Sequence, residues 1–128
     1  MNHLLKLTAV IEAGTGLGLL AVPAVVVRLL LGAEISSASL PLGRVAGVAL
    51  LALGVACWLA HCDEQSRAAR GLVAAMLLYN VATVAVLAFA GVGLGLHGML
   101  LWPAVVLHAA MAVWCVACLR RSPMNVTN

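Results

Sequence analysis

Charge is scarce in this sequence. Only 9% of the 128 residues are Asp, Glu, Lys or Arg, whereas charged residues make up about 25% of an average soluble domain. Hydrophobic residues account for 65% of the chain, so a soluble globule of this composition would expose a large apolar surface to water. The same apolar content excludes a disordered chain and a disulfide-rich secreted scaffold. The composition is therefore that of an integral membrane protein.

Motifs of soluble catalysis are also lacking. No glycine-rich loop is followed by lysine and serine or threonine, and no Ser, His and Asp set stands on the face of a soluble domain. The net charge of +3 is the excess of basic residues expected beside a membrane, so it requires no nucleic-acid partner. We therefore predict no catalytic residues, and no cofactor apart from the soft metal ion considered below.

Four apolar stretches are long enough to cross the hydrocarbon core, which takes about 20 residues of helix. They cover residues 4–22, 41–60, 71–90 and 99–119. Pro23 opens a further apolar run at 23–32, and proline is favoured at the start of a helix because its missing N–H would be unpaired there. We predict one transmembrane domain over 1–128, an all-α four-transmembrane-helix bundle with a short interfacial helix at 23–32. A kinked extension of the first span is the alternative for that segment.

Basic residues are distributed unevenly between the two sides of this topology. Five of the seven lie at the N-terminus, in the 61–70 connection or at the C-terminus, namely Lys6, Arg67, Arg70, Arg120 and Arg121. Arg28 and Arg44 lie on the other side. Because cytoplasmic segments carry the excess of Lys and Arg, we expect a multi-pass protein of the bacterial cytoplasmic (inner) membrane with both termini in the cytoplasm.

Polar side chains inside the spans are the first candidates for function, because each is costly in lipid unless it is paired. At helical spacing every span has one small or polar face, and we expect these faces to meet inside the bundle. The intramembrane polar candidates are Glu12, Asn80 and His108. An intramembrane acid is a functional candidate by default. A hydrogen-bonded structural glutamate and histidine would fit the same pattern, and both interpretations stay open.

Sulfur-bearing residues form a second set of candidates. Cys115-Val-Ala-Cys118 continues a seam that begins at His108, and all four cysteines lie near the cytoplasmic ends of the second and fourth spans. Thiolate, thioether and imidazole groups together suit Cu(I), Zn or another soft metal ion. The candidate metal ligands are Cys57, His61, Cys62, Met111, Cys115 and Cys118. The alternative is that the cysteines pack as small apolar residues.

Glycine spacing predicts where helices approach closely, since helices in lipid meet through small residues. We predict helix packing through Gly14, Gly18, Gly43, Gly47 and Gly54.

The order of the first elements resembles a known family. The chain runs LKLTAVIEAGTGLGLLAVP over 5–23, VRLLLG over 27–32 and GRVAGVALLALG over 43–54. This resembles the DoxX-like small bacterial inner-membrane proteins, which have four helices. The resemblance covers roughly the first half of the chain and brings no catalytic residues to carry over. It implies that an accessory role beside membrane oxidoreductases is plausible.

Two functions from different classes follow from these features. The first is a structural or accessory subunit, because packing explains most of the polar residues and the chain has glycine stripes and no soluble domain. We also expect the bundle to be too small to enclose a generous cavity. Its partners would be the lipid bilayer and either copies of itself, as a homo-oligomer, or a larger membrane complex. The alternative is a transporter or carrier of a small solute or soft metal ion that uses the intramembrane polar and thiol seam. A water-filled inner cavity that reaches Glu12 and His108 would favour the second function.

Overall fold

A computed structural model of the chain describes residues 1–63 and 66–121. Within these residues the elements are α1 (Asn2–Ala21), α2 (Pro23–Leu31), a 3-10 turn (Ser37–Ser39), α3 (Leu40–Ala60), α4 (Arg67–Val92) and α5 (Leu101–Arg121). In the described part of the chain every regular element is helical, and α1, α3, α4 and α5 are long and apolar enough to cross a membrane. The predicted all-α class and its four long apolar helices are confirmed.

The largest boundary error lies at the start of α4, which begins at Arg67 rather than at 71. The polar residues before 71 indicated a loop. In the structure the Ser66 hydroxyl accepts a hydrogen bond of 3.0 Å from the backbone N–H of Ala69. A serine in this position satisfies an amide that has no partner within the helix. The helix therefore starts one turn earlier than hydropathy predicts.

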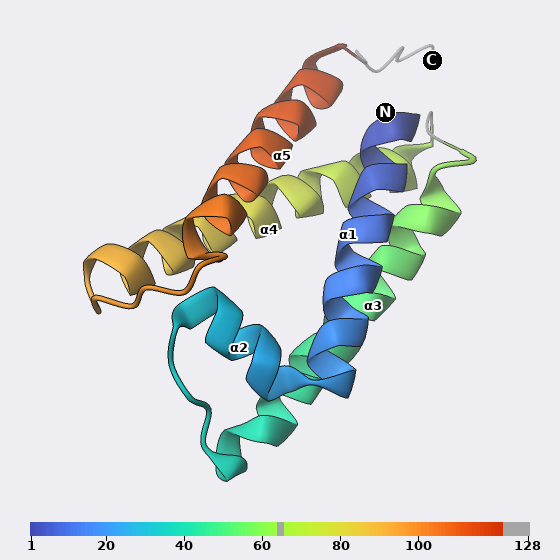
Figure 1. Ribbon diagram of the computed structural model, residues 1–128. Coiled ribbons are helices and arrows are strands. Elements are labelled where there is room, and N and C mark those ends of the chain that lie inside the picture. The colour runs from blue at the N-terminus through green and yellow to red at the C-terminus, as the bar shows by residue number, and fades with distance from the viewer. Residues whose placement is uncertain (64–65, 122–128) are drawn as a thin grey trace, which may run out of the picture.

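The chain breaks between α1 and α2, so the segment after α1 is a separate helix and not a kinked extension. Val22 leaves helical geometry with φ −137° and ψ 59°, and Pro23 then occupies the first turn of α2. The short helix ends at Gly32, whose φ of +69° is in the left-handed region that favours glycine. α2 consequently turns back toward the rest of the molecule instead of continuing along α1 (Figure 1).

α1 packs mainly against α3, and glycine makes this approach close. A Cβ built on Gly47 would lie 2.7 Å from the Gly16 carbonyl oxygen, and one on Gly54 would lie 3.0 Å from the Ala9 carbonyl oxygen. Contact between Gly16 and Gly47 leaves no space for any side chain, as expected where two backbones meet in lipid.

The predicted glycine contacts require one correction. Gly47 and Gly54 lie at the α1–α3 contact, but a Cβ on Gly14 would meet nothing within 4 Å. Gly18 faces the Val26 side chain and Gly43 faces Pro23, so these two glycines pack against α2. The α1 glycine that contacts Gly47 is Gly16. It lies between the two glycines of the Gly14-x-x-x-Gly18 pattern and is not part of that pattern.

The α1–α3 and α4–α5 pairs meet at one end of the molecule and diverge toward the other, where α2 lies between them (Figure 1). The buried core is at the end where they meet, and it contains Leu4, Leu5, Ala9, Cys57, Val73, Met76, Met111, Cys115 and Cys118. At the other end α2 is attached to the segment before α5, because the Leu100 N–H donates a 2.9 Å hydrogen bond to the Leu29 carbonyl. The packed core and the attached α2 therefore enclose the space between the helix pairs.

Candidate functional site

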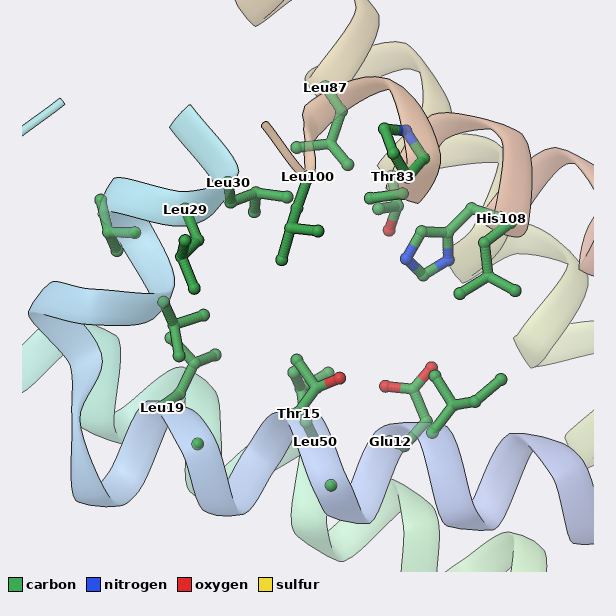
Figure 2. A pocket seen from close by; sticks show the side chains of 18 of the residues that line it. Glu12, Thr15, Leu19, Leu29, Leu30, Leu50, Thr83, Leu87, Leu100 and His108 are labelled. Carbon is green, nitrogen blue, oxygen red and sulfur yellow. The ribbon is translucent and has the colours of Figure 1, made fainter. Parts of the chain in front are cut away.

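A pocket of about 570 Å³ occupies this space, between α1, α2, α4 and α5. Small-molecule sites in proteins span about 300–1,000 Å³, so the volume is that of an ordinary ligand pocket. One part of its wall is apolar and comprises Leu19, Val26, Leu29, Leu30, Leu87 and Leu100. Figure 2 shows Leu19, Leu29, Leu30 and Leu100 toward α2, while Glu12, Thr83 and His108 lie on the side farther from it.

The polar side includes Glu12, whose side chain is 3% exposed. The Tyr79 hydroxyl donates a hydrogen bond of 3.3 Å to Glu12 Oε2, and among the described residues this carboxylate makes no ion pair. None of the residues that line the pocket is Lys, Arg or Asp. Glu12 is thus the one acid of the lining, and no Lys or Arg lines the pocket with it.

His108 is held by a chain of hydrogen bonds that fixes its donor and acceptor atoms. Asn80 Nδ2 lies 2.7 Å from the Met76 carbonyl oxygen, which can only accept, so this atom must be the amide nitrogen. Asn80 Oδ1, which can also only accept, then lies 2.8 Å from His108 Nδ1. His108 Nδ1 therefore carries a hydrogen, and in the neutral imidazole Nε2 is left as an acceptor.

The pocket therefore presents two acceptors from opposite walls. Figure 2 shows the Glu12 carboxylate on α1 and the His108 ring on α5 both directed into the space, with the Thr15 and Thr83 hydroxyls nearby. The Tyr79 ring meets His108 edge-on, with centroids 5.6 Å apart and an interplanar angle of 78°. Tyr79 thus contacts both acceptor residues and stabilises their positions.

The three predicted intramembrane polar residues are all found around this pocket. Glu12 and His108 line it, while Asn80 lies behind the lining and orients His108. Tyr79 was missed, because it adjoins Asn80 in sequence and so falls off the helical stripe that Asn80 defines. A signal was present, since Tyr79 is the sole tyrosine of the sequence.

The cysteines lie elsewhere, at the packed end of the molecule. Cys57, Cys115 and Cys118 are buried in the apolar core together with Met111. Cys62 is exposed, and its Sγ lies 3.4 Å from His61 Nε2. Over residues 1–63 and 66–121 no group of three or more His, Cys, Asp or Glu side chains is close enough to hold a metal ion. In the described residues the predicted soft-metal ligands are therefore not assembled into one site, and the three buried thiols lie in the apolar core.

Comparison of the chain with protein-family models, with curated proteins and with solved structures gives no match. The resemblance to DoxX-like proteins stays a prediction. The function has to be inferred from the residues of the pocket itself.

Proposed function

We propose that this chain is a membrane-embedded carrier that binds a small, mostly apolar solute in the pocket between α1, α2, α4 and α5. The observation that carries the proposal is the pocket of about 570 Å³, with an extended apolar wall and a small polar group at one side. Ligand sites in proteins commonly combine an apolar lining with a few polar groups that orient the ligand. The pocket reaches both Glu12 and His108, and this contact supports a carrier over an accessory subunit.

Gly14 gives the proposal a second support. In a bundle that serves packing alone, a glycine in a small-residue stripe would be covered by a neighbouring helix. Gly14 instead lines the pocket, and a side chain there would meet nothing within 4 Å. The glycine enlarges the pocket without bringing two helices together.

We further propose that the chain spans a bacterial cytoplasmic membrane with both termini in the cytoplasm. The N-terminus, the α3–α4 connection and the end of α5 lie at one end of the molecule (Figure 1). Five of the seven basic residues lie in these segments or in the helix turns next to them, and such an excess favours the cytoplasmic side.

Photolabelling tests the binding proposal with a matched pair of glycine variants. The protein in phosphatidylcholine nanodiscs is irradiated with adamantyl diazirine, a compact neutral probe, and the adducts are mapped by mass spectrometry. We expect adducts on pocket residues such as Tyr79 that excess adamantanol removes. Gly14→Leu should reduce these adducts because its side chain fills the pocket. Gly71→Leu is the control, since Gly71 is a helical glycine with open space around it that does not line the pocket.

Two results would contradict the carrier proposal. One is labelling that adamantanol does not compete away, and the other is labelling that falls equally in both glycine variants. The accessory-subunit prediction has its own test, which is gentle detergent extraction followed by sizing. Co-migration with copies of itself or with a larger complex, together with unsaturable photolabelling, would favour that role instead.

A further inference from the structure

We infer that the pocket selects a primary ammonium group attached to a compact apolar body, so that its ligand is a lipophilic primary amine. The inference rests on the proposed function, because it names the chemical class that the same pocket takes. It follows from the donors and acceptors of the polar side, taken together with the absence of Lys and Arg from the lining.

Glu12 is the first acceptor that the ligand must satisfy. An ionised carboxylate offers about four lone-pair sites, and of these the described side chains fill one, through the Tyr79 hydroxyl. A buried carboxylate without a cation is costly, and a cation in contact with it offsets that cost. Lys6 is on the same helix but six residues away, about 9 Å along the axis, and it is exposed and outside the lining. A cationic ligand would supply the missing partner.

His108 is the second acceptor, and its direction narrows the choice of cation. Its Nδ1–H donates a hydrogen bond to Asn80 Oδ1. In the neutral ring Nε2 can therefore accept a hydrogen bond inside the pocket (Figure 2). A head group between Glu12 and His108 must therefore donate to two walls at once. A primary ammonium has three N–H donors, and the Thr15 or Thr83 hydroxyl can accept the third.

Other head groups fit the same atoms less well. A carboxylate or phosphate would face Glu12 without a Lys or Arg in the lining to bind it. A hydroxyl has one hydrogen to share between two acceptors, and a quaternary ammonium has none. Phosphatidylethanolamine has the right ammonium, but its phosphate would lack a basic partner. The combination favours a compact amine over a phospholipid head group.

The apolar wall accounts for the rest of the ligand. Leu19 of α1 and Leu29 and Leu30 of α2 face the space that leads away from Glu12 (Figure 2). An apolar body would pack against these leucines through van der Waals contacts, while the ammonium provides selectivity.

Binding of three adamantane derivatives tests the inference with one apolar body and three head groups. Tritiated adamantylamine, adamantanol and adamantane carboxylate are each titrated against the intact protein in phosphatidylcholine nanodiscs, with empty nanodiscs as background. We expect adamantylamine to bind at least about tenfold more tightly than adamantanol, as one additional hydrogen bond to a charged group would give. Adamantane carboxylate should show no saturable binding.

Glu12→Gln tests whether the preference for adamantylamine over adamantanol depends on the charge of the carboxylate. The substitution keeps the shape and an acceptor for Tyr79 but removes the charge, so adamantylamine should lose its advantage. An unchanged circular dichroism spectrum and sizing profile show that Glu12→Gln is still folded. His108→Phe keeps a planar ring without the Nε2 acceptor and should also weaken amine binding, leaving adamantanol less affected.

The outcomes separate the inference from the proposed function. Equal affinity for amine and alcohol, with both lost in Gly14→Leu, would overturn the amine assignment and leave the carrier proposal intact. If none of the three compounds shows binding that Gly14→Leu reduces, the result would count against the carrier proposal itself. Nanodiscs that also contain phosphatidylethanolamine distinguish the source of the ammonium. Displacement of adamantylamine by this lipid would overturn the choice of a free amine, and unchanged binding supports it.

Discussion

Tyr79 on α4 donates its hydroxyl hydrogen to Glu12 on α1 across a distance of 3.3 Å. The two residues are 67 positions apart in sequence and belong to different helix pairs. Their bond connects the α1–α3 pair to the α4–α5 pair at the edge of the pocket. A single side-chain contact therefore helps to set both the helix arrangement and the position of the buried acid.

A double-mutant cycle measures how strongly this bond couples the two pairs. We expect Tyr79→Phe to lower the free energy of unfolding by about 0.6 kcal/mol and by at most about 2 kcal/mol, the range measured for side-chain hydrogen bonds in membrane proteins. In a Glu12→Met background the acceptor is gone, so Tyr79→Phe should cost less. Thermal unfolding in detergent, followed by circular dichroism, gives the four values. If the loss of unfolding free energy in the double variant equals the sum of the losses in the two single variants, the contact contributes no coupling.

The second prediction concerns the contact between Gly47 and Gly16. A Cβ on Gly47 would lie 2.7 Å from the Gly16 carbonyl oxygen, which is backbone and cannot move aside alone. We expect Gly47→Ala to destabilise the protein by about 1–3 kcal/mol, the usual cost of overpacking. Gly14→Ala is the matched control, because it adds the same methyl group in open space and should be neutral or stabilising by up to about 1 kcal/mol. Equal effects of the two variants in thermal unfolding would refute the assignment of this contact.

Helix packing also shows where sequence reasoning succeeded and where it could not. The spans were predictable because bilayer thickness fixes the length of an apolar helix, and Pro23 marked the break before α2. The four-residue glycine spacing identified one stripe of α1, but Gly16 lies on another face of the same helix. Spacing gives the faces of a helix and does not give its partner. The contact between Gly16 and Gly47 could therefore be identified only from the structure.

The pocket was beyond prediction for a related physical reason. Helical periodicity indicated that Glu12, Asn80 and His108 face inward, and all three lie at or behind the pocket. Periodicity does not give the angle between helices, however, and the pocket exists because the two pairs diverge (Figure 1). Cys57, Cys115 and Cys118 do lie in the core where the helices meet, yet the described residues hold no group of three or more metal ligands. Spacing along one helix does not show how close the side chains of other helices come.

The third prediction is a tautomer. Because Asn80 Oδ1 accepts from His108 Nδ1, neutral His108 should carry its hydrogen on Nδ1, a state visible in the nitrogen chemical shifts of the imidazole. Comparison with His108→Gln identifies the signal among those of the other histidines. Asn80→Leu removes the acceptor, so the ring should shift toward a mixture of tautomers. An Nε2–H ring in the unmodified protein would contradict the hydrogen-bond chain and the acceptor assigned to the pocket.

The fourth prediction tests how α2 closes one side of the pocket. The Leu100 N–H is bonded to the Leu29 carbonyl, and a Cβ on Gly98 would collide with the Leu30 backbone. We expect Gly98→Ala to displace α2 and to speed hydrogen exchange at the Leu100 amide, because that hydrogen bond would open. Gly71→Ala, in open space on α4, should leave the exchange unchanged. Unaltered protection of Leu100 in Gly98→Ala would show that α2 is held by other contacts.

The native cysteines provide the test of orientation. Cys62 is exposed in the α3–α4 connection, whereas Cys57, Cys115 and Cys118 are buried. A membrane-impermeant maleimide should therefore react with Cys62 alone, and only from the cytoplasmic face if the excess of Lys and Arg sets the topology. We expect labelling in inside-out vesicles, its absence in right-side-out vesicles, and its loss in Cys62→Ser. Ala38→Cys in the Cys62→Ser background is the opposite-side control, because exposed Ala38 lies in the segment between α2 and α3. Labelling of Cys62 from outside and of Ala38→Cys from inside would reverse the proposed orientation, while labelling of both from one face would mean that α3 does not cross the membrane.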